Sequence, residues 1–439
     1  MSSLDPHRDR IRTPEQAAQL IRSHSRVFLS GNCAVPQRVL GALVERAPEL
    51  EDVEIVQVLT IGSADYVAPE MAGHLRVNTL FISDNVRAAV NAGRADFTPC
   101  LLSEVPRLFE SGRLPLDVAL IQVAPPDEHG FCSFGVEVGV TKSAAAAARL
   151  VIAEINPHMP RTLGDAFIHT SRLDAIVPVD YPLPEVRMGA TDPVTEMIAN
   201  HVAPLIPDSA TLQTGIGAIP DAVLRRLTDR RNLGIHTELF ADGVVDLVLR
   251  GVITGERKSL HRGKIISGFV LGTRCLYDFV HDNPIIELHP TEYVNDPFVI
   301  AQNDRMVAIN SAIEVDLTGQ VCADSIGPRL YSGVGGQMDF IYGAARSRGG
   351  IPIIALPSTV RPRGGDGQSL PPVTRITPML RPGAGVTTSR NHVRFVVTEH
   401  GVADLYGKTI AQRAQALIRI AAPEFRDDLL QQARQLNYV

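Results

Sequence analysis

The sequence contains no tryptophan, and aromatic residues make up only 5% of its 439 residues. Proteins that bind single-stranded nucleic acids stack the bases on aromatic side chains, so this scarcity argues against such a role. The net charge of -6 also lacks the basic excess that a nucleic-acid surface requires. We therefore expect no nucleic-acid partner.

Cysteine pairs and metal-binding motifs are also missing. The five cysteines are scattered at Cys33, Cys100, Cys132, Cys275 and Cys322. Without a Cys-x-x-Cys pair or a His-Glu-x-x-His spacing, neither a disulfide framework nor a metal site is predicted. No apolar run reaches the roughly 18 residues of a membrane span, and the polar N-terminus does not resemble a signal peptide. We expect reduced thiols, no metal, no membrane span and a cytoplasmic location.

Short apolar runs alternate with helical patterns along the chain. Runs typical of strands cover residues 27–29, 53–59, 118–123, 151–155, 306–309, 351–356 and 393–397, and helical patterns cover 36–46, 143–149, 220–227 and 410–421. The strand-like runs are continuously apolar, which indicates sheets buried on both faces. Such sheets are parallel and covered by helices, so the sequence predicts an α/β fold with open, mainly parallel sheets.

The length of the chain exceeds what a single core usually supports, so two domains are expected. The proline-rich stretch that begins at Pro178 and ends at Pro193 is the best candidate for a connection. We predict an N-terminal α/β domain over residues 1–180, a linker over 181–193 and a C-terminal α/β domain over 194–439.

The two halves carry similar motifs in the same order. Gly31 and Pro36 follow the first strand-like run with the same spacing as Gly215 and Pro220 in the second half. Farther along, Asp127-Glu-His-Gly-Phe-Cys resembles Asp316-Leu-Thr-Gly-Gln-Val-Cys. Matching motifs in matching order indicate a duplicated α/β unit. A ligand cleft between the two domains is the natural expectation.

Glu238 is the strongest candidate for a catalytic residue. It ends the apolar run that starts at Leu233, and a helical pattern over 244–249 follows. In open α/β sheets the carboxyl ends of the strands line the ligand crevice, where a carboxylate suits nucleophilic or general-base chemistry. The alternative is a glutamate at a helix N-terminus, stabilised there by the helix dipole.

Two glycine turns precede helical patterns. Gly215-Ile216-Gly217 leads to Pro220, which fits a first helical turn, and bare backbone amides there can meet a ligand. The proline breaks the dinucleotide-binding fingerprint, so a Rossmann dehydrogenase is not expected. Gly335-Gly336 opens a second helical pattern, and its amides can stabilise an oxyanion. For both turns the alternative is tight packing alone.

Several charged segments have both a functional and a structural interpretation. The loop with Arg361 and Arg363 is interpreted as a lid or a phosphate contact, or as a disordered connection without a function. Glu399 ends another strand-like run before a glycine turn, which leads on to Lys408. The basic residues over 257–264 form a solvated face or meet phosphates.

Taken together, five segments of the second half resemble class I coenzyme A transferases, most closely the acetyl-CoA hydrolase/transferase family that includes 4-hydroxybutyrate CoA-transferase. They occur in family order and begin at Gly215, Leu233, Ala312, Gly335 and Val397. The first half is similar mainly over residues 30–36. This resemblance implies two α/β domains with the active site between them.

The resemblance also implies a ping-pong transfer of CoA between a short-chain acyl-CoA (4-hydroxybutyryl-, butyryl- or acetyl-CoA) and a carboxylate such as acetate. Glu238 would be the nucleophile and would carry a glutamyl-CoA thioester. The family pattern assigns an oxyanion or acyl site to Gln213, Gly215, Ile216, Gly217, Asn295, Gly335, Gly336 and Glu399, and the repeat adds Asn32. Candidate CoA contacts are Gln337, Met338, Arg361, Arg363 and Lys408.

No tightly bound cofactor is expected, because coenzyme A is a substrate, and a homodimer or larger homo-oligomer is expected from the family. His400 stands where some relatives have tyrosine. Two other functions stay open at this stage. One is an acyl-CoA hydrolase, in which water attacks the same glutamyl intermediate. The other is a non-catalytic acyl-CoA-binding module, although pure binding gives no reason to keep a carboxylate at position 238.

Overall fold

The computed structural model describes residues 7–187, 192–215, 217–362 and 368–439. It contains two compact units. Unit 1 comprises residues 1–187, 238–242 and 264–295, and unit 2 comprises 188–237, 243–263 and 296–439. The chain therefore returns to unit 1 after first leaving it. The predicted linker over 181–193 includes 188–191, which lie outside the described residues.

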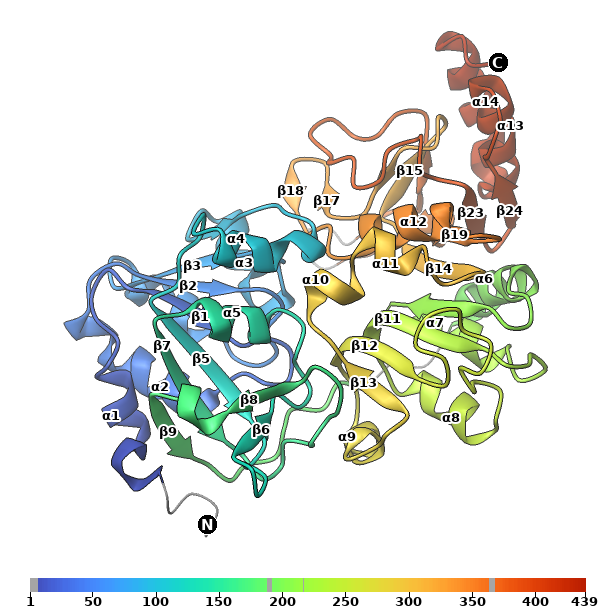
Figure 1. The fold of residues 1–439 in the computed structure, drawn as a ribbon. Coiled ribbons are helices and arrows are strands. Elements are labelled where there is room, and N and C mark those ends of the chain that lie inside the picture. The colour runs from blue at the N-terminus through green and yellow to red at the C-terminus, as the bar shows by residue number, and fades with distance from the viewer. Residues whose placement is uncertain (1–6, 188–191, 216, 363–367) are drawn as a thin grey trace. The chain divides into compact units, whose positions relative to one another are not determined.

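Unit 1 is built on a fully parallel sheet (Figure 1). Its strand order is β4-β3-β2-β1-β5-β7-β9. The strands are β1 (Arg26–Leu29), β2 (Val53–Gln57), β3 (Leu75–Thr79), β4 (Ala95–Phe97), β5 (Val118–Val123), β7 (Leu150–Ile155) and β9 (Ala175–Pro178). Every pairing between neighbours is parallel. Strands β2 and β5 are buried along their whole length, as continuously apolar runs predict.

Helices and a few further strands complete unit 1. The helices are α1 (Pro14–Ala18), α2 (Gln37–Arg46), α3 (Asp84–Asn91), α4 (Val105–Glu110), α5 (Thr141–Ala147), α9 (Arg274–Val280) and α10 (Thr291–Val294). Two pairs of strands are also present: β6 (Phe131–Ser133) with β8 (Phe167–His169), antiparallel, and β12 (Ile265–Val270) with β13 (Ile286–Leu288), parallel. Phe28 and Phe109 meet edge to face in the core, with ring centroids 5.7 Å apart.

Unit 2 repeats this plan. Its strands follow the order β11-β10-β14-β19-β23-β24, parallel except for the last pair. They are β10 (Thr211–Thr214), β11 (Gly234–Phe240), β14 (Met306–Ser311), β19 (Ile351–Ala355), β23 (Phe395–Thr398) and β24 (Gly401–Asp404). Strand β11 begins in unit 2, and from Glu238 onward its residues belong to unit 1.

The helices of unit 2 are α6 (Pro193–Val202), α7 (Ala218–Arg225), α8 (Gly243–Leu249), α11 (Pro297–Ile300), α12 (Gln337–Arg346), α13 (Ile410–Ile420) and α14 (Arg426–Gln435). Unit 2 also contains a small three-stranded sheet and two strand pairs. The sheet has the order β16 (Val321–Cys322), β15 (Glu314–Asp316), β22 (Ile376–Thr377), and the pairs are β17 (Ser325–Ile326) with β18 (Arg329–Leu330) and β20 (Thr359–Val360) with β21 (Val373–Thr374). Pro423 lies between α13 and α14, and α13 packs on β24 (Figure 1).

The order of the strands confirms the predicted α/β fold of two similar domains. Order β2-β1-β5-β7-β9 in unit 1 matches β11-β10-β14-β19-β23 in unit 2, and all these pairs are parallel. The two glycine turns occupy equivalent places, because Gly31 follows β1 and Gly215 follows β10. The duplicated motifs of the sequence therefore correspond to duplicated topology.

The second pair of motifs folds alike in detail. Asp127 accepts hydrogen bonds through Oδ1 from the backbone N–H groups two and four residues ahead, at 3.0 and 2.9 Å. Asp316 does the same at 2.9 and 2.9 Å. Gly130 and Gly319 then adopt φ values of +83° and +93°, which glycine adopts without strain. A short aspartate turn followed by glycine is thus the local structure that both copies share.

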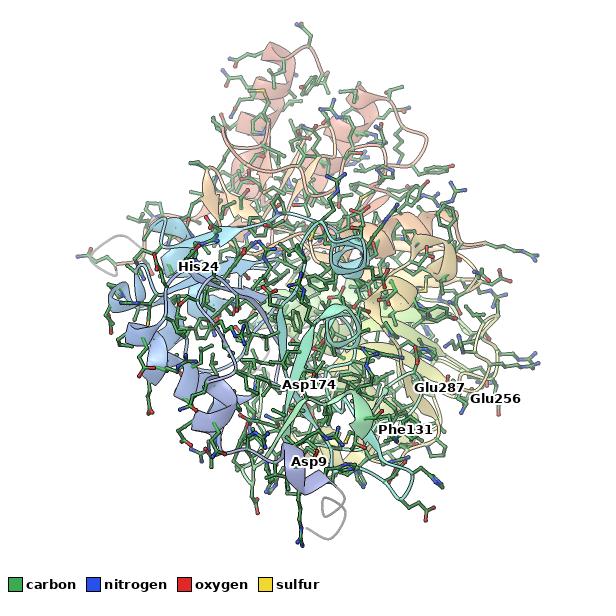
Figure 2. All side chains as sticks on the ribbon, turned by 60° about the vertical axis from the view of Figure 1, so that its left-hand side comes forward. Asp9, His24, Phe131, Asp174, Glu256 and Glu287 are labelled. Atoms are coloured by element: carbon green, nitrogen blue, oxygen red, sulfur yellow. The ribbon has the colours of Figure 1, made fainter. Side chains whose placement is uncertain are left out.

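The strand after the first of these turns lies at the surface of unit 1. Phe131, labelled in Figure 2, is 43% exposed on β6. Its ring lies 5.0 Å from the His169 ring on β8. Among the described residues, no helix combines the length and the apolar character needed to cross a membrane.

Replacing Gly130 by alanine should destabilise the protein by about 1–3 kcal/mol, because a side chain at positive φ is strained. The added Cβ would also lie 2.8 Å from His169 Nε2. Gly41→Ala, an exposed site inside α2 with no atom within 4 Å of the new Cβ, should instead stabilise by about 0.5–1 kcal/mol. Denaturant unfolding of both variants measures this, and equal shifts would contradict the assignment of the turn.

Candidate active site

Glu238 lies within β11 and not at a helix N-terminus. The strand continues to Phe240, two residues beyond the end that the sequence suggested, and helix α8 begins only at Gly243. Glu238 is also the one residue of β11 that is not buried. The helix-dipole interpretation is therefore unsupported, and a half-buried carboxylate on the carboxyl half of a parallel strand remains.

Asn295 holds the carboxylate of Glu238. Its Nδ2 donates a hydrogen bond to Glu238 Oε2 at 2.8 Å, and the asparagine follows the short helix α10 within the same unit. Its side chain is fully buried, and its Oδ1 has no hydrogen-bond partner among the described residues. A buried amide that donates to a carboxylate restricts the orientation of the carboxylate oxygen atoms.

The backbone around Glu238 is equally constrained. Ser267 Oγ donates to the Glu238 carbonyl at 3.0 Å. A Cβ at the neighbouring Gly268 would lie 3.2 Å from that carbonyl oxygen and 3.9 Å from Gly139 Cα. Gly268 therefore brings the strand of Glu238 close to the segment around Gly139, and a larger residue at this position would separate them.

That segment carries a second carboxyl group, Glu137, which the sequence analysis missed. Glu137 is 4% exposed, its Oε2 accepts a hydrogen bond from Asn32 Nδ2, and its Oε1 accepts from the Val140 N–H at 3.3 Å. Its backbone bridges Phe269 on β12. The available signal was a single carboxylate between Gly135 and Gly139 in an otherwise apolar stretch.

Burial raises the pKa of Glu137 to about 7, and the charge of Glu238 adds to this rise. Hydrogen bonds from Asn32 and from the backbone of Val140 and Thr141 oppose it. Two carboxylates in one low-dielectric region repel each other, so one of them holds its proton more tightly. The structure thus distinguishes a half-buried carboxyl, Glu238, from a buried one, Glu137.

Asn32 connects this pair to the first glycine turn. Its φ is +50°, and its backbone N–H donates to the Leu59 carbonyl at 2.5 Å. Gly31 is needed beside it, because a Cβ there would lie 2.5 Å from the same oxygen. The sequence placed Asn32 at the site through the repeat, and the structure brings it to Glu137, within the unit that contains Glu238.

The remaining acyl-site candidates belong to unit 2. Gln213 Oε1 accepts from Asn310 Nδ2 at 3.1 Å, and Gly215 and Gly217 follow β10. Gly335 has a φ of +54°, and Gly336 precedes α12. Glu399 is buried and accepts hydrogen bonds from the Ser358 N–H and hydroxyl. Ile216 lies outside the described residues.

The CoA-contact candidates are dispersed within unit 2. Gln337 Nε2 donates to the Ser311 carbonyl at 2.7 Å, and Met338 follows it on α12. Arg361 is exposed, and Lys408 Nζ donates to the Asp404 carbonyl. Arg363 lies outside the described residues. These residues stay predictions.

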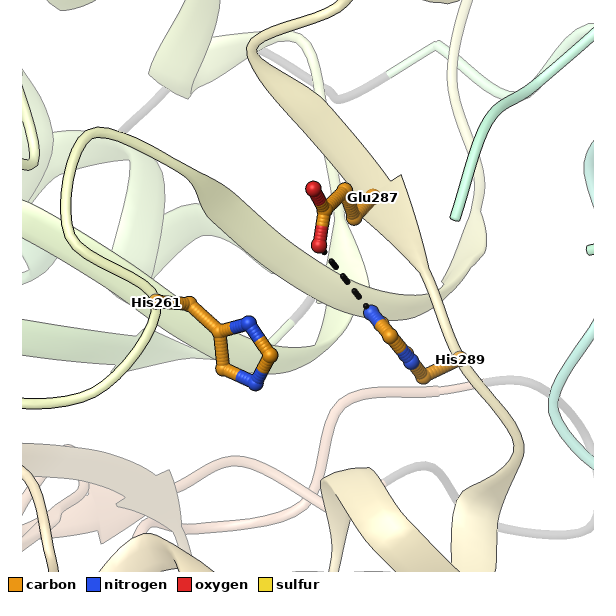
Figure 3. A group of neighbouring side chains, drawn as sticks. All are labelled: His261, Glu287 and His289. Atoms are coloured by element: carbon orange, nitrogen blue, oxygen red, sulfur yellow. Dashed lines mark hydrogen bonds and ion pairs between the residues drawn. The ribbon is translucent and has the colours of Figure 1, made fainter. Parts of the chain in front are cut away.

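Figure 3 shows His261, Glu287 and His289, residue types that can ligate a metal. Glu287 and His289 belong to unit 1 and interact at 3.4 Å, and Glu287 also pairs with Lys264 at 3.1 Å. Burial lowers the pKa of His289. His261 belongs to unit 2. Glu287 therefore forms an ion pair with Lys264 and contacts the His289 ring, and we assign no metal to these residues.

Known proteins with similar sequences match along the whole chain. The acetyl-CoA hydrolase/transferase N-terminal domain matches residues 3–184, and the C-terminal domain of the same family matches 272–433. 4-hydroxybutyrate coenzyme A transferase from Clostridium kluyveri is 52% identical over 97% of each chain. The chain belongs to the acetyl-CoA hydrolase/transferase family.

Two further relatives support this membership. Butyryl-CoA:acetate CoA-transferase from Anaerostipes caccae is 36% identical, over 99% of this chain and 98% of its own. The crystal structure of RipA from Yersinia pestis is 35% identical and superimposes with a TM-score of 0.92 over the full length of both chains. The protein is a CoA-transferase. In the sequence, Glu238 falls between residues 184 and 272, which neither family domain matches, so the match itself assigns no role to Glu238.

The proton on Glu137 makes stability depend on pH. Its pKa is 4.5 when unperturbed and about 7 in the folded protein, so the folded state binds more protons between these values. The contribution of Glu137 to the free energy of unfolding is therefore fully present below the unperturbed pKa of 4.5, and it is lost as pH rises through the folded-state pKa of about 7. The difference amounts to roughly 3 kcal/mol at about 1.4 kcal/mol for each pKa unit.

We expect Glu137→Gln, which cannot ionise, to gain about 3 kcal/mol relative to the wild type between pH 5 and pH 8. Denaturant unfolding at both pH values measures this gain. The exposed Glu70→Gln in the same unit is the control and should show no such gain. A stability difference between Glu137→Gln and wild type that is the same at both pH values would show that Glu137 is ionised in the folded protein.

Proposed function

We propose that this enzyme transfers CoA between a short-chain acyl-CoA and a carboxylate such as acetate, with Glu238 as the nucleophile. The observation that carries the proposal is the half-buried Glu238 carboxylate on β11, oriented by the buried Asn295 amide. The relatives named for 4-hydroxybutyrate and for butyryl-CoA and acetate support an acyl group of about that size.

The chemistry follows from what a carboxylate can form. Glu238 attacks the thioester carbonyl of the acyl-CoA, the C–S bond breaks, and an acyl-glutamyl anhydride and CoA thiolate result. The thiolate then attacks the glutamyl carbonyl, which releases the free carboxylate and leaves a glutamyl-CoA thioester. The acceptor carboxylate reverses both steps. Each intermediate is close in energy to the next, which is the benefit of covalent catalysis here.

Asn295 supports each attack by Glu238. Its Nδ2 donates to one carboxylate oxygen and so restricts the orientation of the carboxylate. Its buried Oδ1, which has no partner among the described residues, is proposed to accept from a hydroxyl group of the substrate or from water. The amides around Gly335 and Gly336, with Gln213 and Glu399, are proposed to serve the oxyanion and the acyl group.

Hydrolysis is the alternative outcome of the same intermediate, because water can attack the glutamyl thioester in place of the carboxylate. Release of free CoA without an acceptor measures it. We further propose that no tightly bound cofactor takes part, that CoA is bound only as substrate, and that the enzyme acts as a cytoplasmic homo-oligomer, as the sequence analysis expects.

Glu238→Gln should lower the rate of CoA exchange by at least about 10⁴-fold, because an amide cannot form the anhydride. Borohydride added to the enzyme with butyryl-CoA should reduce the wild-type thioester, and mass spectrometry should locate the change in the peptide that contains Glu238. Glu292→Gln, an exposed glutamate of unit 1 that accepts a hydrogen bond from the Ser143 hydroxyl, is the control. An unmodified Glu238 peptide in an active enzyme would refute the covalent route.

Asn295→Ala should reduce kcat by about 10²–10³-fold, the usual effect of removing one positioned hydrogen-bond donor. We expect the KM for acyl-CoA to change little, because the amide acts on Glu238. Asn283→Ala, which removes an amide bonded to the Phe279 carbonyl in the same unit, controls for loss of folding. Equal kcat values for the two variants would exclude a role for Asn295 in orienting the nucleophile.

A further inference from the structure

In unit 1, Asn295 bonds Glu238 and Asn32 bonds Glu137 in the same way. Both asparagines are at least nine-tenths buried, and the Oδ1 atom of each has no hydrogen-bond partner among the described residues. Only the first pair has a role in the proposed chemistry. Burying the Asn32–Glu137 pair costs free energy, and the proposed chemistry gives no reason for that cost.

The backbone places Glu137 beside the reacting residue. Gly139 N–H donates to the Gly268 carbonyl at 3.0 Å, and Gly268 in turn contacts the Glu238 carbonyl. Glu137 Oε1 would lie 3.1 Å from a Cβ at Gly139, so its carboxyl lies over the same segment. The charge of Glu238 accordingly acts on Glu137.

The Asn32–Glu137 pair can hold either charge state of the carboxyl. In the structure Asn32 Nδ2 donates to Glu137, which suits an ionised carboxylate. A half-turn of the amide presents Oδ1 instead, which accepts a hydrogen bond from a protonated carboxyl. Because Oδ1 has no other partner within the described part of the chain, this rotation breaks no Oδ1 bond there.

The other groups around Glu137 do not exchange protons near neutral pH. Cys33 follows Asn32 in the chain, and burial raises the pKa of its thiol to about 11. Tyr277 on α9 hydrogen-bonds Cys33, and burial raises the pKa of its phenol. The backbone amides of Val140 and Thr141 donate to Glu137, and the Thr291 hydroxyl also lies beside Gly139. Glu238 is the charged partner that changes during the reaction.

We propose that Glu137 balances the charge at Glu238: it holds a proton while a carboxylate, either that of Glu238 or that of the acceptor, occupies the site, and releases it when Glu238 is the uncharged thioester. This inference rests on the proposed function. The proton passes to and from solvent, and no other bond changes. Glu137 is a positioning residue in this scheme, since it acts on charge and does not touch the reacting atoms.

The scheme makes binding of the acceptor dependent on pH. In the thioester intermediate the repulsion from Glu238 is gone, so Glu137 ionises more readily. A carboxylate acceptor then brings a second negative charge and requires Glu137 to take up a proton. The kcat/KM for the carboxylate acceptor should therefore fall as pH rises from 6.5 to 9, by up to about tenfold per pH unit. The kcat/KM for acyl-CoA, whose reacting thioester group is uncharged, should fall much less.

The test measures kcat/KM for acetate and for butyryl-CoA over this pH range. We expect kcat/KM for acetate to fall with pH in the wild type and in the Glu292→Gln control. In Glu137→Gln we expect kcat/KM for acetate to be independent of pH. A wild-type acetate profile that is flat, or a slope that persists in Glu137→Gln, overturns the proposal. A merely structural role of Glu137 would lower activity equally at every pH.

A second measurement uses only the wild-type enzyme, in case Glu137→Gln does not fold. Hydroxylamine, an uncharged nucleophile, releases CoA from the glutamyl thioester at a rate that should not show the acetate slope. Equal pH slopes for acetate and hydroxylamine overturn the proposal. If borohydride traps Glu238 while kcat/KM for acetate does not change with pH, the charge-balancing proposal is refuted and the proposed function stands. If Glu238 is not trapped and no exchange occurs, the proposed function fails with it.

Discussion

The hydrogen bond from Asn295 to Glu238 is the interaction on which the proposed chemistry depends. Glu238 is the one residue of β11 that is not buried, and the buried Asn295 amide restricts the orientation of its carboxylate. The Ser267 hydroxyl donates to the Glu238 carbonyl, and the small Gly268 lets the neighbouring backbone come close to it. The proposed nucleophile, its orienting group and its backbone support are thus all found in one unit.

The duplicated architecture explains how such a site arises. Parallel strands expose their carboxyl ends at one edge, and each copy follows its first strand with a glycine turn and a helix. In the first copy this turn carries Asn32, which bonds Glu137. The first half, whose likeness to the family rested on few residues, therefore supplies part of the polar surroundings of unit 1. The same topology serves different chemistry in its two copies.

Much of the fold could be predicted because its signals are local. Apolar runs predicted β5 and β19, and a helical pattern over 410–421 predicted α13. The aspartate turns at Asp127 and Asp316 repeat as the motifs indicated, since their hydrogen bonds reach only two and four residues ahead. The end of β11 was predicted less well: the strand runs past Glu238 because the pairing of strands, and not the local sequence, decides where it stops.

The sequence by itself determined the α/β class, the duplication and the choice of Glu238, since these follow from apolar periodicity, repeated motifs and one carboxylate on an apolar strand. Only the tertiary structure decided which groups surround that carboxylate. Asn295 lies 57 residues from Glu238, and Asn32 lies 105 residues from Glu137. Contacts over such separations come from strand order and loop packing, and the elevated pKa of Glu137 comes from burial. Neither leaves a local pattern, because burial and proximity belong to the folded chain.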